Sequence, residues 1–254
     1  MNSCQNKIKV VFENINRYYG KTKILDNINL HISEGELVAI VGPSGCGKST
    51  IFNIIAGLLK PDAGKVIYRG EDITGKSGII SYSFQKDLLL PYMTIEENVA
   101  LPLLIKKEKK ADALVKANEM LKEFKLDAYA KKYPKELSGG MRQRIALLRT
   151  YLFSKDVSLL DEPFSALDAI TKDEMHDWYM NMRRKYKTST IFITHDVDEA
   201  IYLGTRVIVM APRPGVIKED IKIDMEYPRN RNSDEFIEHR KHILDVLNLS
   251  LIHI

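Results

Sequence analysis

Cysteine, tryptophan and long apolar runs are scarce in this sequence, and the shortages of cysteine and of apolar runs each exclude a class of protein. The 254 residues include two cysteines, Cys4 and Cys46, and one tryptophan. Two cysteines cannot form the disulfide framework of a small secreted domain, and free thiols suit a reducing cytoplasm. The longest apolar stretch, 51–59, is interrupted by Asn53 and is far shorter than the ~20 residues of a spanning helix. The first ten residues also lack the apolar core of a secretory signal, so we expect a chain that does not cross a membrane.

Excess charge of one sign is also modest. The formal net charge is +4, and 28% of the residues are charged. This balance is too weak to indicate nucleic-acid binding by itself. A hydrophobic content of 44% is typical of a folded globular protein, and the length allows one large domain with an inserted subdomain.

Periodicity divides the chain into an α/β core and a helical insert. Alternating or short continuous apolar runs predict strands at 8–14, 24–32, 37–41, 66–68, 79–84, 157–160, 190–194 and 207–210. A helix is predicted at 49–59, and the charge-rich stretch 96–151 is helical in pattern, with Leu114, Ala117 and Leu121 on one face. Alternating strands and helices favour a mostly parallel sheet covered by helices.

A glycine-rich segment between a predicted strand and a predicted helix is the strongest chemical signal. It matches the pattern G-x-x-x-x-G-K-[ST], in which backbone N–H groups and a helix N-terminus cradle phosphates. Lys48 is predicted to contact the β- and γ-phosphates, and the Ser49 hydroxyl to bind Mg²⁺. The candidate nucleotide-binding residues here are Gly42, Pro43, Ser44, Gly45, Cys46, Gly47, Lys48, Ser49 and Thr50.

Two acids follow the buried strand at 157–160. Nucleotide hydrolases use carboxylates in this position to hold Mg²⁺ and to polarise water. Asp161 is therefore a candidate metal-binding residue, and Glu162 is the candidate general base for the attacking water.

A third segment, 137–144, reads LSGGMRQR and precedes the acidic strand. It resembles the signature of ATP-binding-cassette (ABC) ATPases, apart from Met141 where the family usually has glutamine. The resemblance covers about residues 8–230. It implies a P-loop NTPase (RecA-like) α/β core with an antiparallel β subdomain and an inserted helical subdomain. It also implies that Ser138, Gly139 and Gly140 serve the nucleotide held by an opposing subunit.

Other positions match the same family individually. Gln85 resembles the glutamine that contacts Mg²⁺ and the attacking water, and His195 resembles the switch histidine that contacts the γ-phosphate. Tyr19 resembles the aromatic residue that stacks on adenine, although Tyr18 is an alternative. Asp168 resembles the end of the loop that packs across the dimer. The resemblance thus implies Glu162, His195 and Gln85 as catalytic residues.

These observations imply a domain organisation. We expect one ABC ATPase domain at 1–248, with its core at about 1–85 and 156–230, a helical subdomain at about 86–155, and a short helix at about 233–248. The last six residues, 249–254, have no family counterpart and match the translation of a sequencing adapter, so we expect a non-native tail.

Segments 84–91 and 194–200 resemble importer cassettes, and 207–215 resembles the nitrate, sulfonate, taurine and thiamine-precursor importer branch. This resemblance implies ATP and Mg²⁺ as cofactors and a second copy of the chain as partner. It also implies an integral membrane permease, indirectly a substrate-binding protein, no nucleic acid, and a peripheral location on the cytoplasmic face. The alternative is a non-transport ABC ATPase of nucleic-acid or ribosomal complexes. The resemblance argues against that alternative, because ABC ATPases of DNA repair carry a long coiled coil and ribosomal types carry two cassettes in one chain. This sequence shows neither sustained heptads nor a second cassette.

Overall fold

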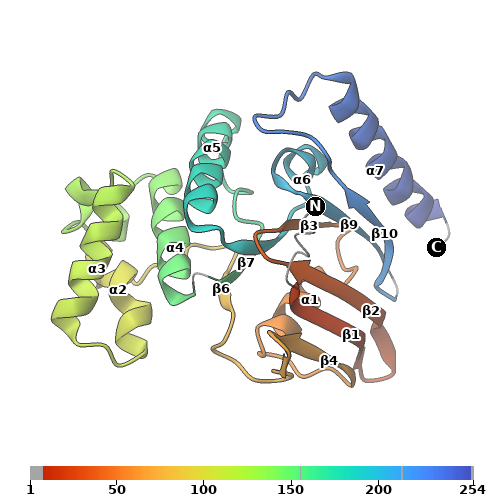
Figure 1. Ribbon diagram of the computed structural model, residues 1–254, viewed down its shortest axis with the longest axis horizontal. Coiled ribbons are helices and arrows are strands. Elements are labelled where there is room, and N and C mark those ends of the chain that lie inside the picture. Colours follow the sequence, from red (N-terminus) through yellow and green to blue (C-terminus); the bar gives the residue numbers. More distant parts are fainter. Residues whose placement is uncertain (1–7, 155, 213, 253–254) are drawn as a thin grey trace, which may run out of the picture.

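The computed structural model describes residues 8–154, 156–212 and 214–252, the last four by their backbone alone. Two sheets and seven α-helices form the described part of the chain (Figure 1). The antiparallel sheet has the order β2 (Thr22–Ser33), β1 (Ile8–Tyr19), β4 (Ala63–Tyr68), β5 (Glu71–Asp72). The second sheet has the order β10 (Val216–Lys222), β9 (Arg206–Ala211), β3 (Leu37–Val41), β8 (Ser189–Ile193), β7 (Val157–Asp161), β6 (Ser81–Ser83).

The second sheet is parallel except at β10, which pairs antiparallel with β9. All five residues of β3 are buried, which confirms the prediction of a strand covered on both faces. Its side chains alternate between two apolar clusters, with Val38 and Ile40 in one and Leu37, Ala39 and Val41 in the other. The carboxyl end of β3 leads directly into the glycine-rich segment.

The first strand is longer than the sequence pattern predicts. It continues to Tyr19 because Asn14 adopts φ 52° at a register shift, after which pairing with β2 resumes at Ile15. The extra residue at the bulge breaks the alternation on which the predicted end at residue 14 depended. Strands β5 and β10 were not predicted.

The helices are α1 (Lys48–Ile55), α2 (Ile95–Ile105), α3 (Lys110–Glu123), α4 (Gly139–Phe153), α5 (Ala169–Tyr186), α6 (Val197–Leu203) and α7 (Asp234–Ile252), with 3-10 turns at Asp127–Tyr129 and Pro134–Glu136. The prediction of a helix at 49–59 was wrong at its end. Gly57 takes φ 71°, and a Cβ there would lie 2.2 Å from the Lys76 carbonyl oxygen. The helix therefore ends just before Gly57, which must lie against the backbone of Lys76, and does not continue towards Pro61.

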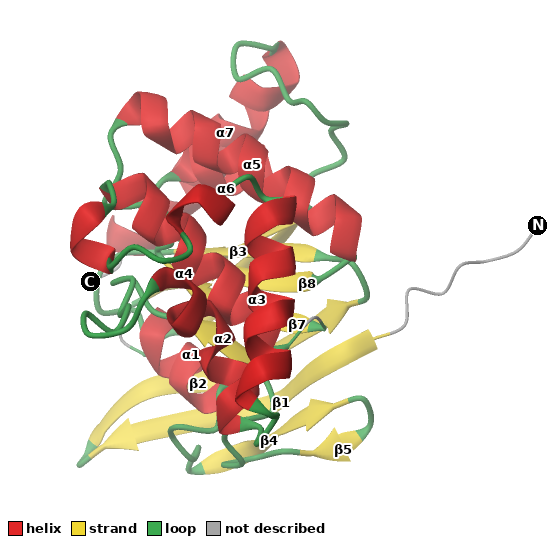
Figure 2. Ribbon diagram, turned by 90° about the vertical axis from the view of Figure 1, so that its left-hand side faces the viewer, coloured by secondary structure: helices red, strands yellow, loops and turns green. Residues whose placement is uncertain are grey.

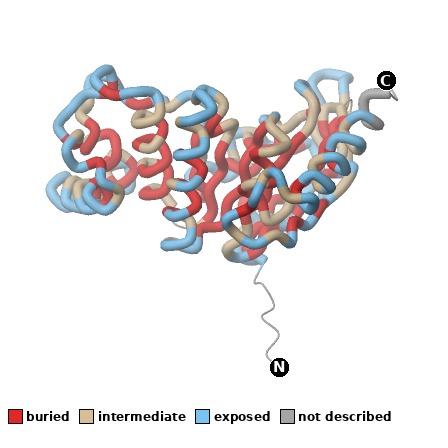
Figure 3. Tube along the Cα trace, turned by 90° about the horizontal axis from the view of Figure 1, so that it is seen from above, coloured by how far each residue is buried: buried red, intermediate tan, exposed pale blue. Residues whose placement is uncertain are grey.

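Helices α2, α3 and α4 form the predicted helical subdomain, at the opposite end of the molecule from the antiparallel sheet (Figure 1). Thr94 starts α2 with a capping box to Glu97. Helices α5 and α6 pack on one face of the parallel sheet, whereas α1 packs on its other face, in the same apolar cluster as residues of the antiparallel sheet (Figure 2). Buried segments run through the middle of the molecule from the helical subdomain into the core (Figure 3).

The C-terminal helix α7 begins near the predicted position but continues to Ile252. Phe236 and Ile243 are buried, so its first turns pack on the core. The non-native origin of 249–254 stays a prediction, and residues 253 and 254 lie outside the described part. Within that part, no helix has both the length and the apolarity needed to span a bilayer.

Candidate active site

The glycine-rich segment forms a loop closed by its own lysine. The Lys48 ammonium donates to the carbonyl oxygens of Gly42 at 2.7 Å and Pro43 at 3.0 Å. Gly45 and Gly47 adopt φ 78° and 99°, a region that glycine enters without steric cost. Gly47 is the N-cap of α1 and offers no side-chain acceptor, so the first N–H groups of the helix remain available to an anion.

The inner side of this loop packs tightly against the core. A Cβ at Gly47 would lie 2.5 Å from Leu25 Cδ2, and one at Gly42 would lie 2.8 Å from the Met210 carbonyl oxygen. The Cys46 side chain is fully buried, which raises the pKa of its thiol. Cys46 can therefore offer a phosphate only its backbone.

Gly215 supports the loop from the β9–β10 connection, and sequence reasoning missed this role. A Cβ at Gly215 would lie 2.1 Å from the Cys46 carbonyl oxygen. Its N–H donates to the Ile24 carbonyl at 2.8 Å, and its carbonyl accepts from the Asp26 N–H at 3.0 Å.

The outer side of the glycine-rich loop remains open, because Ser44, Gly45 and Ser49 are exposed. The residues therefore fit a triphosphate approaching from solvent.

Asp161 ends β7 close to the loop. Its carboxylate accepts a hydrogen bond from the Tyr82 hydroxyl at 3.2 Å. Burial raises its pKa, and the neighbouring Glu162 raises it further, while Tyr82 and Lys48 oppose the shift. A divalent cation would relieve this carboxylate of its unfavourable burial.

Glu162 lies at the centre of a polar cluster formed by three segments. Its backbone adopts φ 46° and its N–H donates to the carbonyl of Ile193, so the chain turns sharply after β7. Gln85 Nε2 lies 3.0 Å from Glu162 Oε2, and His195 Nδ1 lies 3.5 Å from the same oxygen. Ser165 fastens the turn by donating to the Glu162 carbonyl at 3.0 Å. The structure thus brings together all three residues predicted to be catalytic.

The residues suit a magnesium ion that is bound together with a nucleotide. The described residues hold no group of three or more His, Cys, Asp or Glu side chains able to bind a metal by themselves. Mg²⁺ in nucleotide sites commonly takes one or two protein oxygens and completes its shell with phosphates and water. Ser49, Asp161 and Gln85 are the predicted protein ligands.

The segment 138–140 forms the N-terminus of α4. The Ser138 hydroxyl accepts from the Met141 N–H at 3.3 Å, so it acts as the N-cap. Ser138 and Gly139 are exposed, and a Cβ on Gly139 would have nothing within 4 Å. Gly140 instead faces its own chain, where a Cβ would lie 2.8 Å from Thr171 Cγ2.

Asp168 has a structural partner within the chain. Its carboxylate caps α5, accepting from the Thr171 N–H at 3.1 Å and from the Thr171 hydroxyl at 2.7 Å. These hydrogen bonds lower the pKa of Asp168. Since both carboxylate oxygens serve the helix cap, the residue positions the loop before α5 and has no contact of its own with the cluster around Glu162.

Comparison with known proteins agrees with this geometry. A family model described as "ABC transporter" matches residues 25–165. The chain is 43% identical to the aliphatic sulfonates import ATP-binding protein SsuB of Bacillus cereus, over 92% of this chain and 94% of that protein. The chain belongs to the ABC transporter family. The predicted resemblance to ABC ATPases of the sulfonate and nitrate importer branch is confirmed, and the chain is an ATP-binding, ATP-hydrolysing subunit of this type.

Further relatives of this ABC ATPase support the assignment. An uncharacterised ABC transporter ATP-binding protein of Methanocaldococcus jannaschii is 42% identical over 95% of this chain and 92% of its own length. A solved dimeric ATP-binding cassette, in a post-hydrolysis state bound to ADP and Pi, has TM-score 0.71 and 33% identity over 85% of this chain and all of that one. A nucleotide-free cassette has TM-score 0.79 and 25% identity over 97% and 99%. The predicted fold class is thereby confirmed.

The two candidate adenine-stacking residues of this ABC ATPase remain alternatives. Tyr19 is 53% exposed and Tyr18 is 40% exposed, at the end of β1. Arg17 lies over the ring of Tyr19 at 5.1 Å, and Lys23 lies over that of Tyr18 at 5.7 Å. Either ring is accessible enough to stack on a base.

Sequence reasoning missed two further groups beside the site. One is Tyr82, because nothing in the sequence placed its hydroxyl against Asp161. The other is a pair of arginines on α4 that anchor the segment after Gln85: Arg142 Nε donates to Asp87 at 3.0 Å, and Arg149 donates to the Asp87 carbonyl at 2.6 Å. The basic character of α4 was visible in the sequence, but its partner segment was not.

Proposed function

We propose that this ABC ATPase drives import of a small organic or anionic nutrient through a separate membrane permease. The observation that carries the hydrolytic part is the convergence of Gln85 and His195 on one carboxylate oxygen of Glu162, beside Asp161 at the end of β7. A base must lie within hydrogen-bond reach of the group that it activates, together with groups that orient it.

Each residue contributes by positioning and charge, as is typical of phosphoryl transfer. Glu162 accepts the proton of the attacking water, which Gln85 orients. Lys48 supplies positive charge to the β- and γ-phosphates, and His195 contacts the γ-phosphate. Ser49, Asp161 and Gln85 would hold Mg²⁺, which neutralises phosphate charge when it is bound.

A second copy of the chain would complete each site. Ser138 and Gly139 form an exposed helix N-terminus that contacts nothing in its own chain at the Gly139 position. Such a terminus binds anions through its N–H groups. Because a related cassette was solved as a dimer, we place the nucleotide between this terminus and the glycine-rich loop of the partner.

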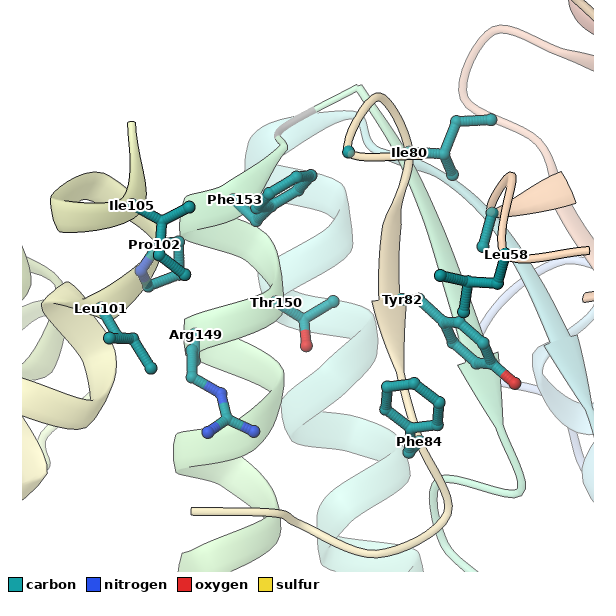
Figure 4. Close-up of a pocket in the computed structure, with 12 residues that line it drawn as sticks. Leu58, Ile80, Tyr82, Phe84, Leu101, Pro102, Ile105, Arg149, Thr150 and Phe153 are labelled. Carbon is teal, nitrogen blue, oxygen red and sulfur yellow. The ribbon is translucent and has the colours of Figure 1, made fainter. Parts of the chain in front are cut away.

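An apolar groove between the core and the helical subdomain supports the permease as partner (Figure 4). It has a volume of about 290 Å³. Leu58 and Phe84 on the core side and Ile105 on the helical side are 56%, 42% and 67% exposed. An exposed apolar recess of this kind indicates a protein-binding site. We propose that a cytoplasmic segment of the permease occupies it, which would hold this chain peripherally on the cytoplasmic face.

The groove is connected through direct contacts to the carboxylates of Asp161 and Glu162. Phe84 and Tyr82 line it, and their rings stack at 4.2 Å. Tyr82 donates to Asp161, and Gln85, which follows Phe84, lies 3.0 Å from Glu162. A segment bound in the groove would therefore contact Tyr82, which is hydrogen-bonded to Asp161, and Phe84, which precedes Gln85 in the chain.

The substrate is chosen by the permease and a substrate-binding protein in this proposal. Aliphatic sulfonates are the first candidates, because 43% and 42% identical relatives are named for their import. A pyrimidine precursor of thiamine is a further candidate.

The test is Mg²⁺-dependent ATP hydrolysis by the purified chain at increasing protein concentration, beside Glu162→Gln. We expect specific activity to rise with concentration, and the variant to bind ATP, remain dimeric and lose turnover. Equal activity of parent and variant would reject Glu162 as the base. An activity independent of concentration would reject the two-copy site.

A further inference from the structure

The residues on both sides of His195 are anchored, although the His195 side chain itself is 64% exposed. Thr194 is buried, and its N–H donates to the Ile40 carbonyl at 3.2 Å, in the strand that precedes the glycine-rich loop. Its hydroxyl accepts from the Asp196 N–H at 3.1 Å, which closes a tight turn around His195. The backbone of His195 is therefore held in place, while its ring, beside Glu162, remains accessible to a ligand.

A buried carboxylate holds this turn. Glu199 is 3% exposed, and its Oε2 accepts from the Thr194 hydroxyl at 2.6 Å. The Glu199 N–H in turn donates to Asp196 Oδ1 at 3.1 Å, where Asp196 caps α6. One residue thus fixes both neighbours of His195.

Two side chains of α5, one turn apart, hold the other side of the turn around His195. Lys172 donates to Asp196 Oδ2 at 2.6 Å and lies 3.7 Å from Glu199 Oε2. His176 is 1% exposed, and its Nε2 lies 3.3 Å from Glu199 Oε1. Because Arg231 can only donate to His176 Nδ1, at 3.3 Å, the Nε2–H is the donor to Glu199.

The same histidine also contacts the segment after Glu162. The ring of Phe164 meets that of His176 edge-on, with centroids 4.9 Å apart. Phe164 is buried and lies two residues beyond the candidate base. His176 therefore lies between the segments that carry Glu162 and His195.

We infer that Glu199, with Thr194, Lys172 and His176, is a positioning unit that holds His195 at the distance from Glu162 required for hydrolysis. The inference rests on the proposed role of His195. A buried polar network could serve core stability alone. Here, however, its hydrogen bonds converge on Thr194 and Asp196, the two residues that flank the exposed imidazole of His195. Fixing such a side chain through its supporting residues is a general requirement of active sites.

An isosteric pair tests the unit directly. Thr194→Val keeps the shape of the side chain but removes the hydroxyl, whereas Thr194→Ser keeps the hydroxyl. We expect Thr194→Val to lower kcat of ATP hydrolysis by roughly 10- to 100-fold, the range that small misplacement of a reacting group causes. KM for ATP should change little, since the glycine-rich loop is untouched. Thr194→Ser should keep kcat within about threefold, because it retains both hydrogen bonds.

Glu199→Gln provides a second variant. A carboxylate accepts from both Thr194 and His176, but an amide offers an acceptor to only one of them. We expect an intermediate fall in kcat. Asp198→Asn is the matched control: it lies on the same helix, pairs with Arg240 at 2.7 Å and is partly exposed, so kcat should be unchanged.

Epistasis separates positioning from simple loss of stability. In a His195→Ala background, Thr194→Val should cause no further fall in kcat at a temperature where both proteins are folded. An additive fall would overturn the inference. So would normal activity of Thr194→Val in a protein that His195→Ala inactivates, whereas no effect of His195→Ala would reject the proposed catalytic role itself.

A spectroscopic readout does not depend on activity. The chain has six histidines, so the imidazole Cε1–H signals can be resolved by NMR and that of His195 assigned with His195→Ala. Thr194→Val should shift or broaden the His195 signal, and Thr194→Ser should leave it in place. An unchanged His195 signal in Thr194→Val would contradict the positioning role.

Discussion

The glycine-rich loop before α1 and the glycine pair at the start of α4 both present a helix N-terminus, but they differ in what surrounds them. The first has a cation of its own in Lys48, and its glycines are pressed against Leu25 and the Met210 carbonyl. The second has no such backing at Gly139, where a Cβ would meet open space. The first terminus is a nearly complete phosphate cradle, whereas the second would be one half of the proposed shared site.

In the proposed two-copy site, this difference would let a single chain bind ATP yet require a copy of itself for efficient hydrolysis. A helix N-terminus alone contributes modest electrostatic stabilisation, since its dipole corresponds to roughly half a charge. The loop adds the full charge of Lys48 and packed, preorganised N–H groups. Variants at the two termini should therefore fail in different ways.

The largest effect is expected from Lys48→Met. Removing the cation should abolish detectable nucleotide binding and reduce hydrolysis on the order of 10²- to 10³-fold, as is typical for loss of a preorganised electrostatic group. Calorimetric titration with ATP and a phosphate-release assay measure both. Lys65→Met, an exposed position on β4, serves as control. Normal ATP affinity in Lys48→Met would remove the distinction between the two termini.

Gly139→Asp should reduce hydrolysis by a similar or smaller factor, but by another route. The new side chain meets no atom of its own chain, and an acid in the first turn favours the helix, so folding should be unaffected. The carboxylate would repel the phosphates of a partner. We expect at least 10-fold lower activity, unchanged ATP binding by the single chain, and no ATP-dependent dimer in size-exclusion chromatography.

Mixing the two variants sharpens the comparison. A heterodimer of Lys48→Met and Gly139→Asp chains contains one intact combination of loop and opposing helix terminus, by the two-fold symmetry of such a dimer. A mixture should regain up to about a quarter of parental activity, because half of the dimers are mixed and each has one intact site. If an equimolar mixture regained nothing above either variant alone, the sites would not be shared between chains.

The smallest effect is expected from Tyr82→Phe, which affects only the loop side. Its hydroxyl donates to Asp161, so its loss should change the apparent Mg²⁺ affinity by a few-fold, consistent with ~1 kcal/mol for one hydrogen bond. The activity at saturating Mg²⁺ should remain close to that of the parent. Titration of hydrolysis with Mg²⁺ and removal with EDTA measure the change. An identical titration curve would show that this hydrogen bond does not tune Asp161.

Much of the cradle itself could be predicted from the sequence. The spacing of Gly42, Gly47 and Lys48 between an apolar run and a helical pattern suffices, because backbone geometry and one nearby side chain make the loop. The burial of β3 could also be predicted from a local pattern, its continuous run of five apolar residues. In contrast, no local pattern in the sequence marks His176, and only the fold shows it to be buried beside Glu199.

The sequence by itself determined which chemical groups stand at the ends of strands, because apolar runs followed by polar residues read directly along the chain. Only the tertiary structure decided which of them meet. Gln85 and Glu162 are 77 positions apart, and they touch because β6, β7 and β8 are neighbours in the sheet although they are distant in the chain. Strand order is set by packing of both sheet faces against helices and loops, and this collective choice is not contained in any local pattern.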